Sequence, residues 1–425
     1  MWLRFRVANH RSIQDEQTLS LVAVPRRGEP RGTAPLRVAG IYGANASGKS
    51  NVLDALHWMI DAIRSSHTTW SPNGGVPRAP FKLSASGSGS PSFFELDFLH
   101  EDVRYSYGFE VDDMQVTGEW LNSFPKGRAK RLFERDGPAD MVFGRGLTGE
   151  VQRIRRLTRP NSLFLSCAAS NNHPLLSSLY KHLTRRILFA RLGEEDEGFR
   201  LNLTKYLLGE ESMAPILNGL LRIADLGIDR AEVVEAPPEA PHATMSDLPP
   251  ETLDDPTSKA ALEIMMAKLI LSRPGDLTPL SLEEESAGTR SWLSLLGYAL
   301  FAFSVGGVLV SDEIDSSLHP LLSSTLIRMF KDPDINPRGA QLVFASHDTT
   351  LLGPLLEEEI LARDEVWFTE KDASGATSLY SLAEFHPRRD ENVERGYLQG
   401  RYGAVPYLNF ENVRDIFLER IPERS

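Results

Sequence analysis

The chain has 425 residues, of which 41% are hydrophobic and 24% charged, as in an ordinary globular protein with a sizeable core. Its net charge of -12 argues against a generally basic nucleic-acid-binding coat, and its single cysteine excludes a disulfide framework and a cysteine-rich metal site. The N-terminus lacks the apolar stretch of a signal peptide, and the apolar run near 295–310 is too short and too interrupted by glycine to span a bilayer. We therefore expect a cytoplasmic protein with no membrane partner.

A phosphate-binding loop is the first motif along the chain. Residues 38–42 are predicted to form a short apolar strand, and the segment 43–50, Gly-Ala-Asn-Ala-Ser-Gly-Lys-Ser, fits the loop pattern at every fixed position. Apolar residues then follow at helical spacing: Val52, Leu56, Met59 and Ile63. A coincidental Gly-rich turn is the alternative, and the strand before the loop and the helix after it argue against that alternative.

Each part of this loop has a predicted role in holding ATP. Its glycines let successive backbone N–H groups curl around phosphate oxygens at the start of a helix. Lys49 would reach the β- and γ-phosphates, and Ser50 would offer its hydroxyl to Mg²⁺. The predicted nucleotide contacts in this segment are Gly43, Asn45, Ala46, Ser47, Gly48, Lys49, Ser50 and Asn51.

The next elements complete an N-terminal lobe and lead into an insert. The segments 93–98 and 105–109 have the aromatic, partly alternating pattern of a β-hairpin, and the N-terminal ATPase lobe is predicted to span 1–125. Residues 126–285 are predicted to be a mostly helical insert lobe, with a flexible acidic and Pro-rich linker at 235–256. No sustained heptad repeat is present, so a compact lobe is expected in place of a coiled coil.

A basic island lies inside this insert. Residues 126–191 contain 14 Lys and Arg against four acids, in a chain that is acidic overall. Such an island indicates a surface for the phosphate backbone of a nucleic acid or for an acidic partner. The alternative is that these side chains only solvate helices.

Residues 286–385 are predicted to form the C-terminal ATPase lobe, because strand–helix–strand alternation typical of a parallel sheet returns there. The apolar run 308–311 ends in Asp312 and Glu313, as expected for a buried strand whose tip meets a ligand. Asp312 is predicted to hold Mg²⁺, and Glu313 to polarise the attacking water. His347 ends the next apolar strand, where it could touch the γ-phosphate, although a lone histidine at a strand end is more often structural.

The order and spacing of these motifs resemble an ABC-type ATPase head. Ser286-Ala287-Gly288 is similar to the signature Ser-x-Gly of that family, the segment at Asp315 to the D-loop, and His347 to the switch histidine. The signature reads Ser-Ala-Gly-Thr where transporters have Ser-Gly-Gly-Gln, which argues against a transporter subunit. No Q-loop can be placed, and Gln115 and Gln152 are the candidates.

The opening segment 5–13 is similar to the first strand of the RecF, SMC and overcoming-lysogeny (OLD) ATPases. The runs 312–320 and 397–406 resemble a narrower group, the prokaryotic "AAA" ATPases of restriction-modification and abortive infection, which includes Septu-, PARIS- and retron-associated types. The resemblance implies an α/β fold: an ABC-type P-loop ATPase head with a mixed sheet and a helical insert lobe. It also implies slow hydrolysis of ATP with Mg²⁺, with Lys49, Glu313 and His347 as the catalytic residues.

The resemblance further implies a head-to-head dimer that traps ATP, in which Ser286, Gly288 and Asp315 contact nucleotide across the interface. A sensor or regulator of anti-phage defence with a separate effector, such as a nuclease or toxin, is the leading hypothesis. A RecF- or SMC-like DNA-repair ATPase that binds DNA and a nucleotide-switched scaffold remain as alternatives. The C-terminal tail, predicted at 386–425, is too short for a nuclease domain, although a nuclease hidden in the insert stays open.

Overall fold

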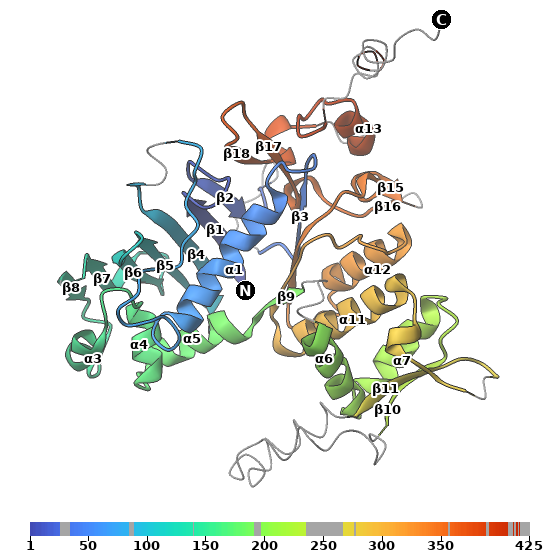
Figure 1. Ribbon diagram of the computed structural model, residues 1–425, viewed down its shortest axis with the longest axis horizontal. Helices are drawn as coiled ribbons and strands as arrows, with labels where there is room; N and C mark the ends of the chain where they lie inside the picture. Colours follow the sequence, from blue (N-terminus) through green and yellow to red (C-terminus); the bar gives the residue numbers. More distant parts are fainter. Residues whose placement is uncertain are drawn as a thin grey trace, which may run out of the picture.

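The protein is described by a computed structural model, which covers residues 1–25, 35–84, 89–138, 140–190, 197–234, 267–275, 278–355, 358–387 and 391–406, and isolated residues beyond. Two large sheets organise these residues (Figure 1). The linker predicted at 235–256 lies outside the described residues, as does most of the predicted tail after residue 406.

A six-stranded central sheet carries the sequence motifs. Five of its strands are parallel, and β18 pairs antiparallel with β17 at one edge, so the sheet is mixed as expected. In spatial order the strands are β18 (Thr377–Ser381), β17 (Val366–Lys371), β3 (Val38–Tyr42), β14 (Gln341–Ala345), β13 (Val308–Ser311) and β9 (Ile187–Ala190). The strand β3 therefore lies beside both β14 and β17, close to the middle of the sheet.

A seven-stranded antiparallel sheet lies beside the first. In spatial order its strands are β2 (Gln17–Ser20), β1 (Trp2–Ala8), β4 (Ser92–His100), β5 (Val103–Val111), β6 (Val116–Phe124), β7 (Lys130–Asp136) and β8 (Asp140–Phe143). The predicted hairpin is confirmed, because Phe94 pairs with Phe109 and Phe98 with Tyr105 across β4 and β5. Smaller sheets join β10 (Arg230–Val234), β11 (Lys268–Ser272) and β12 (Leu280–Ser281), and β15 (Pro354–Leu355) with β16 (Glu358–Glu359).

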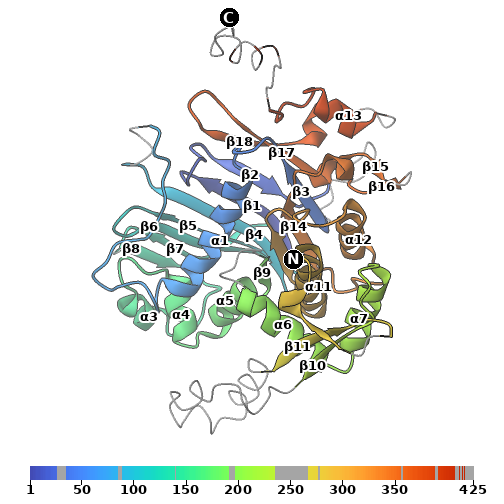
Figure 2. The ribbon, with the colours of Figure 1, turned by 45° about the vertical axis from the view of Figure 1, so that its right-hand side comes forward.

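The helices cover both faces of the central sheet (Figure 2). The described helices are α1 (Lys49–Ser65), α3 (Val151–Leu157), α4 (Phe164–Ser170), α5 (Pro174–Arg185), α6 (Glu197–Gly209), α7 (Ala214–Ile223), α11 (Ala287–Val305), α12 (Pro320–Lys331) and α13 (Val393–Leu398). The helix α1 packs between the two sheets, and its residues at helical spacing, Val52, Leu56, Met59 and Ile63, are all buried, as predicted.

The central sheet separates two hydrophobic cores. Along β3, Ala39 and Ile41 face the core shared with α1, α4, α5 and the antiparallel sheet. Val38 and Tyr42 face the second core, which α6, α7, α11 and α12 complete. Successive side chains of a strand point to opposite faces, so a sheet covered on both sides reads as the continuous apolar run seen in the sequence.

The interval 126–285 divides differently from the expected insert lobe. Its first strands, β7 and β8, extend the antiparallel sheet, and β9 forms an edge of the central sheet. The strands β8 and β9 have only four residues each, which is too short for their pattern to separate them from the helices around them in the sequence. Within the predicted tail, Tyr397 and Tyr402 stack on Phe368 of β17 at interplanar angles of 7° and 13°.

Candidate nucleotide-binding site

The phosphate loop connects the C-terminal end of β3 to the start of α1. Gly48 precedes the helix with a φ of 112°, in the left-handed region that favours glycine. Close packing also requires glycine at two positions. A Cβ on Gly43 would lie 2.5 Å from the Thr369 carbonyl oxygen, and a Cβ on Gly48 would lie 2.2 Å from Thr377 Oγ1. The loop is thus pressed against β17 and β18.

A set of hydroxyl groups forms hydrogen bonds with the phosphate loop on the side that faces β17 and β18. The sequence did not reveal this hydroxyl brace. Ser47 Oγ lies 2.6 Å from Thr369 Oγ1, and Thr377 Oγ1 donates to the Ser47 carbonyl oxygen at 3.0 Å. Ser12 Oγ lies 2.7 Å from Thr377 Oγ1 and accepts from Asn51 Nδ2 at 2.5 Å. Three segments distant in the chain therefore fix the loop, and only the fold brings them together.

Lys49 is folded back onto its own loop. Its Nζ donates to the carbonyl oxygens of Gly43 at 2.8 Å and Ala44 at 3.1 Å. Burial lowers the pKa of the Lys49 ammonium from its ordinary value of 10.5, and the nearby carboxylates of Asp312 and Glu313 act in the opposite direction. The ammonium group is held by carbonyl oxygens, which phosphate oxygens can replace.

The two predicted carboxylates share a cavity with the start of α1. A cavity of about 600 Å³ is lined by Ser50 and Asn51 on one side and by Asp312 and Glu313 on the other. This arrangement follows from topology, because β3 and β13 are parallel and flank β14, so their C-terminal ends open on the same edge. Glu313 has a φ of 52°, which turns the chain sharply directly after the strand.

The same cavity contains residues that sequence reasoning missed. Arg11, Asp54, His57 and Phe189 also line it. Asp54 accepts from His10 Nε2 at 2.8 Å and pairs with Arg11 Nε at 2.5 Å, and these partners lower its pKa against the opposing effect of burial. The spacing of Asp54 and His57 after the loop places them on the exposed side of α1, which is the only signal that the sequence offered for them.

The residues present fit a divalent cation beside Ser50. Asp312 Oδ1 is buried and has no hydrogen-bond partner among the described residues. A buried carboxylate oxygen without a donor is costly, and a hard cation with oxygen ligands is a suitable partner. The Ser50 hydroxyl and the Asp312 carboxylate therefore form a chemically suitable pair of ligands for Mg²⁺ in the lining of one cavity.

His347 and Asp315 lie at the same end of the sheet. The backbone N–H of His347 donates to Asp315 Oδ2 at 3.3 Å, and His347 Nδ1 lies 3.5 Å from Lys49 Nζ. Asp315 Oδ1 is buried and has no partner among the residues that the structure describes. The structure thus brings the predicted switch histidine and D-loop aspartate to the phosphate loop.

The predicted signature lies at the start of α11. Ser286 is the N-cap, and its Oγ accepts from the Thr289 N–H at 3.2 Å. Gly288 lies against the D-loop segment, since a Cβ there would be 2.8 Å from the Ser317 carbonyl oxygen. Neither Ser286 nor Gly288 lines the cavity that contains Ser50 and Asp312. Within one chain, the signature therefore stays outside that cavity.

The candidate Q-loop residues are not at this site. Gln115 lies in the turn between β5 and β6, where its N–H donates to Asp112 Oδ1 at 2.7 Å, and Gln152 is exposed on α3. The edge strand β9 also leads toward the cavity, but the residues that follow it, 191–196, lie outside the described residues.

Among the described helices, none is long and apolar enough to cross a membrane.

Comparisons with known proteins give similar solved structures and a matching sequence family. No curated protein matches the chain significantly. Two similar solved structures are a crystal structure of the Smc head bound to the C-winged helix domain of ScpA, and one from Pyrococcus furiosus of the Smc head domain with an extended coiled coil bound to the C-terminal domain of ScpA. The first is 11% identical in sequence and has a TM-score of 0.43, and the match covers 89% of this chain and 97% of the Smc head chain. The second is 12% identical, covers 91% and 99%, and has a TM-score of 0.41.

The decisive match is to a sequence family. Residues 38–353, which run from the strand before the phosphate loop to beyond His347, match the family described as "AAA domain, putative AbiEii toxin, Type IV TA system". The matched region contains the phosphate loop, the carboxylates and the signature in the order seen in the structure. Because the match extends over most of the 425 residues, the chain belongs to this AAA-domain ATPase family.

Proposed function

We propose that this protein binds and hydrolyses ATP with Mg²⁺ as an ABC-type head, and acts as the sensor or regulator of a prokaryotic anti-phage defence system. A separately encoded effector, such as a nuclease or toxin, would carry out the damaging reaction. The observation that supports the ATPase most strongly is the convergence of Lys49, Ser50 and Asp312, with Glu313 and His347, at one edge of the central sheet.

ATP binding would begin with an exchange of partners at Lys49. Its ammonium group leaves the carbonyl oxygens of Gly43 and Ala44 and contacts the β- and γ-phosphates. Backbone N–H groups of residues 45–51 would contact the phosphates at the start of α1, where the helix dipole also favours negative charge. The hydroxyl brace at Ser47 keeps the loop in shape while this exchange takes place.

Hydrolysis would need positioning and charge neutralisation more than covalent chemistry. Ser50 and Asp312 would hold Mg²⁺, which would supply positive charge to offset that of the phosphates. Glu313, whose side chain is exposed to the cavity, would polarise the attacking water and accept its proton. His347 Nδ1 lies 3.5 Å from Lys49 Nζ, which supports a role for the histidine as a hydrogen-bond donor to the γ-phosphate through its other ring nitrogen.

A second copy of the chain would complete the site. Ser286 and Gly288 begin a 19-residue helix whose first N–H groups lack intrahelical acceptors, so they can bind an anion. Since they do not line the cavity of their own chain, the γ-phosphate that they contact would belong to the partner head. ATP would then hold two heads together, with Asp315 at the interface, and hydrolysis would release them.

The defence role rests on the family description, which names an abortive-infection toxin and a toxin–antitoxin system. The test is a phage plating assay with the chain and its neighbouring genes, compared with Lys49→Ala, Glu313→Gln and the control Lys268→Ala, an exposed residue of β11. Protection that both site variants lose and the control keeps supports the proposal. Protection in all variants contradicts it. If the site variants make cells sensitive to DNA damage but leave phage plating unchanged, the alternative of a DNA-repair ATPase is favoured.

A further inference from the structure

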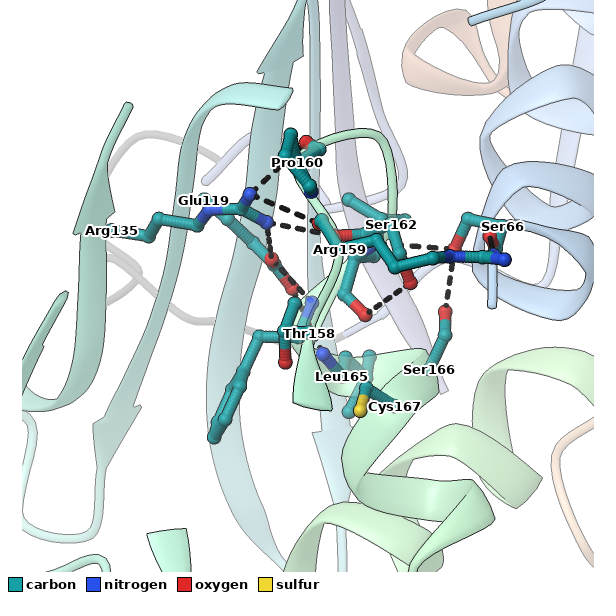
Figure 3. Close-up of polar contacts among 12 residues, drawn as sticks. Ser66, Glu119, Arg135, Thr158, Arg159, Pro160, Ser162, Leu165, Ser166 and Cys167 are labelled. Carbon is teal, nitrogen blue, oxygen red and sulfur yellow. Dashed lines mark hydrogen bonds and ion pairs between the residues drawn. The ribbon is translucent and has the colours of Figure 1, made fainter. Parts of the chain in front are cut away.

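The fold divides the basic island of residues 126–191 into internal and surface arginines. Arg135 is 2% exposed and donates to the carbonyl oxygens of Ser162 at 2.7 Å and Pro160 at 3.0 Å (Figure 3). Arg159 Nη2 donates to the carbonyl oxygens of Ser66 at 2.8 Å and His67 at 3.1 Å, just past the end of α1. These two arginines hold the segment 158–166 in place, so they are not available to an external partner.

Other cations of the island gather at one end of the antiparallel sheet. The turn between β6 and β7 exposes Lys126, Arg128 and Lys130. The chain after β8 returns to the same end, because the Gly144 N–H donates to the Leu132 carbonyl oxygen at 2.8 Å. The exposed Arg145 follows directly, next to the start of β7.

The C-terminal half of α5 adds further cations at this end. His182 of α5 lies 3.2 Å from His100 through their Nδ1 atoms, and Ser178 Oγ lies 2.9 Å from His100 Nε2. His100 ends β4, at the same end of the sheet as the β6–β7 turn, since Arg104 pairs with Phe124 across β5 and β6. We call the following exposed residues the basic sheet end: Lys126, Arg128, Lys130, Arg145, Lys181, Arg185 and Arg186.

The charges of the basic sheet end are not neutralised within the described part of the chain. None of its seven cations forms an ion pair with a described carboxylate, whereas Arg131 in the same hairpin pairs with Glu134. Two exposed acids of the β4–β5 turn, Glu101 and Asp102, lie at the same end. The local excess is therefore positive in a chain with a net charge of -12.

We propose that the basic sheet end binds the sugar-phosphate backbone of a nucleic acid. From β4 to β8 the cations extend over four strand spacings, or about 19 Å at about 4.8 Å each, which matches several phosphates in a row. No large apolar side chain that is exposed lies in 125–131, 144–146 or 181–186. Protein interfaces have an apolar or aromatic centre, whereas nucleic-acid interfaces are polar and positive, so this surface fits the phosphate backbone better than an acidic protein.

The surface lies away from the nucleotide site. The cavity that contains Ser50 and Asp312 opens at the C-terminal end of β13, whereas Arg186 lies just before β9, whose first residue pairs with the first residue of β13. Nucleic acid bound at the basic sheet end would therefore leave the ATP cavity open. Binding should accordingly be measurable without ATP, and a failure to bind leaves the proposed ATPase untouched.

The test measures the salt dependence of binding to a short fluorescein-labelled DNA duplex, by anisotropy and without nucleotide. The variant Lys126→Gln/Arg128→Gln/Lys130→Gln should bind at least tenfold more weakly, and its slope of log K against log salt should fall by about 2 to 3, at about 0.9 per lost phosphate contact. The control, Arg222→Gln/Arg230→Gln/Lys268→Gln, changes the net charge equally on exposed residues of α7, β10 and β11.

The control should keep the affinity and the salt slope of the wild type. An equal loss of DNA affinity in the control and in Lys126→Gln/Arg128→Gln/Lys130→Gln would overturn the proposal, because binding would then depend only on net charge. Absence of DNA binding by the wild type at low salt would overturn it as well. Competition by polyglutamate as effective as competition by unlabelled DNA would also overturn it, in favour of an acidic protein partner.

Discussion

The buried ion pair between β6 and β7 allows a quantitative prediction for Arg135→Met. Arg135 Nη1 lies 3.8 Å from Glu119 Oε2, and the two side chains are 1% and 0% exposed. Removing the guanidinium leaves the carboxylate buried with its three remaining donors, Tyr107 and the N–H groups of Phe164 and Leu165. Breaking a buried pair from one side costs about 3–5 kcal/mol, so we expect a loss of that size in the free energy of unfolding.

Urea unfolding followed by circular dichroism measures this loss, and Arg131→Met is the matched control. Arg131 lies on the same strand, but its side chain is 51% exposed and pairs with an exposed Glu134, so its removal should cost less than about 1 kcal/mol. The double variant Glu119→Gln/Arg135→Met should be more stable than Arg135→Met alone, because it leaves no buried charge. Equal stability of Arg135→Met and Arg131→Met would refute the reasoning.

The pH dependence of the same variant has a definite sign. Burial raises the pKa of Glu119 above its ordinary value of 4.5, and Arg135 opposes that effect. Without Arg135 the pKa of Glu119 in the folded state rises further. The stability that the protonated Glu119 provides is fully present below the pKa of the unfolded state, and it is lost as the pH rises through the pKa of the folded state. The deficit of Arg135→Met should therefore be smaller at about pH 5 than at about pH 8. A deficit that grows toward acid pH would contradict this assignment.

Three further predictions concern the nucleotide site, the partner chain and nuclease activity. Thr377→Val removes the hydroxyl that donates to the Ser47 carbonyl oxygen, and at about 1 kcal/mol it should weaken ATP binding about fivefold in calorimetry; unchanged affinity would show that the brace is dispensable. Ser286→Arg should abolish ATP-driven dimers in light scattering while ATP binding to the single chain persists, and dimers as abundant as in the wild type would contradict the signature assignment. The purified protein should not cut plasmid DNA, linear DNA or transfer RNA with ATP and Mg²⁺ or Mn²⁺, and cleavage that disappears on mutation of a carboxylate outside the ATP site would identify a nuclease.

The sequence was most informative where one segment carries both the structural and the chemical pattern. The phosphate loop, the strand that ends at Asp312, and the strand before His347 are each continuous, and the structure places them together at one edge of the sheet. Buried parallel strands are apolar throughout and end at the ligand, so a single run of residues predicts both the element and its role.

The remaining features depend on contacts between distant segments. Ser12, Thr369 and Thr377 meet behind the phosphate loop although more than three hundred residues separate the first from the others, and no local pattern marks them. The basic island shows the same limit, because charge in the sequence did not distinguish the buried Arg135 and the inward-facing Arg159 from exposed cations such as Lys126. Burial and register decide that distinction, and both come from tertiary structure.

The most direct test of the ATPase assignment compares ATP binding and phosphate release by the wild type and Glu313→Gln, measured on the same preparations. Glu313 faces the cavity beside Ser50 and Asp312, while Lys49 and the loop that bind phosphate are unchanged in the variant. The account predicts that Glu313→Gln binds ATP with an affinity within about twofold of the wild type. Its rate of phosphate release should be lower by at least about 100-fold, as expected for loss of a general base. Phosphate release by Glu313→Gln at the wild-type rate would contradict it.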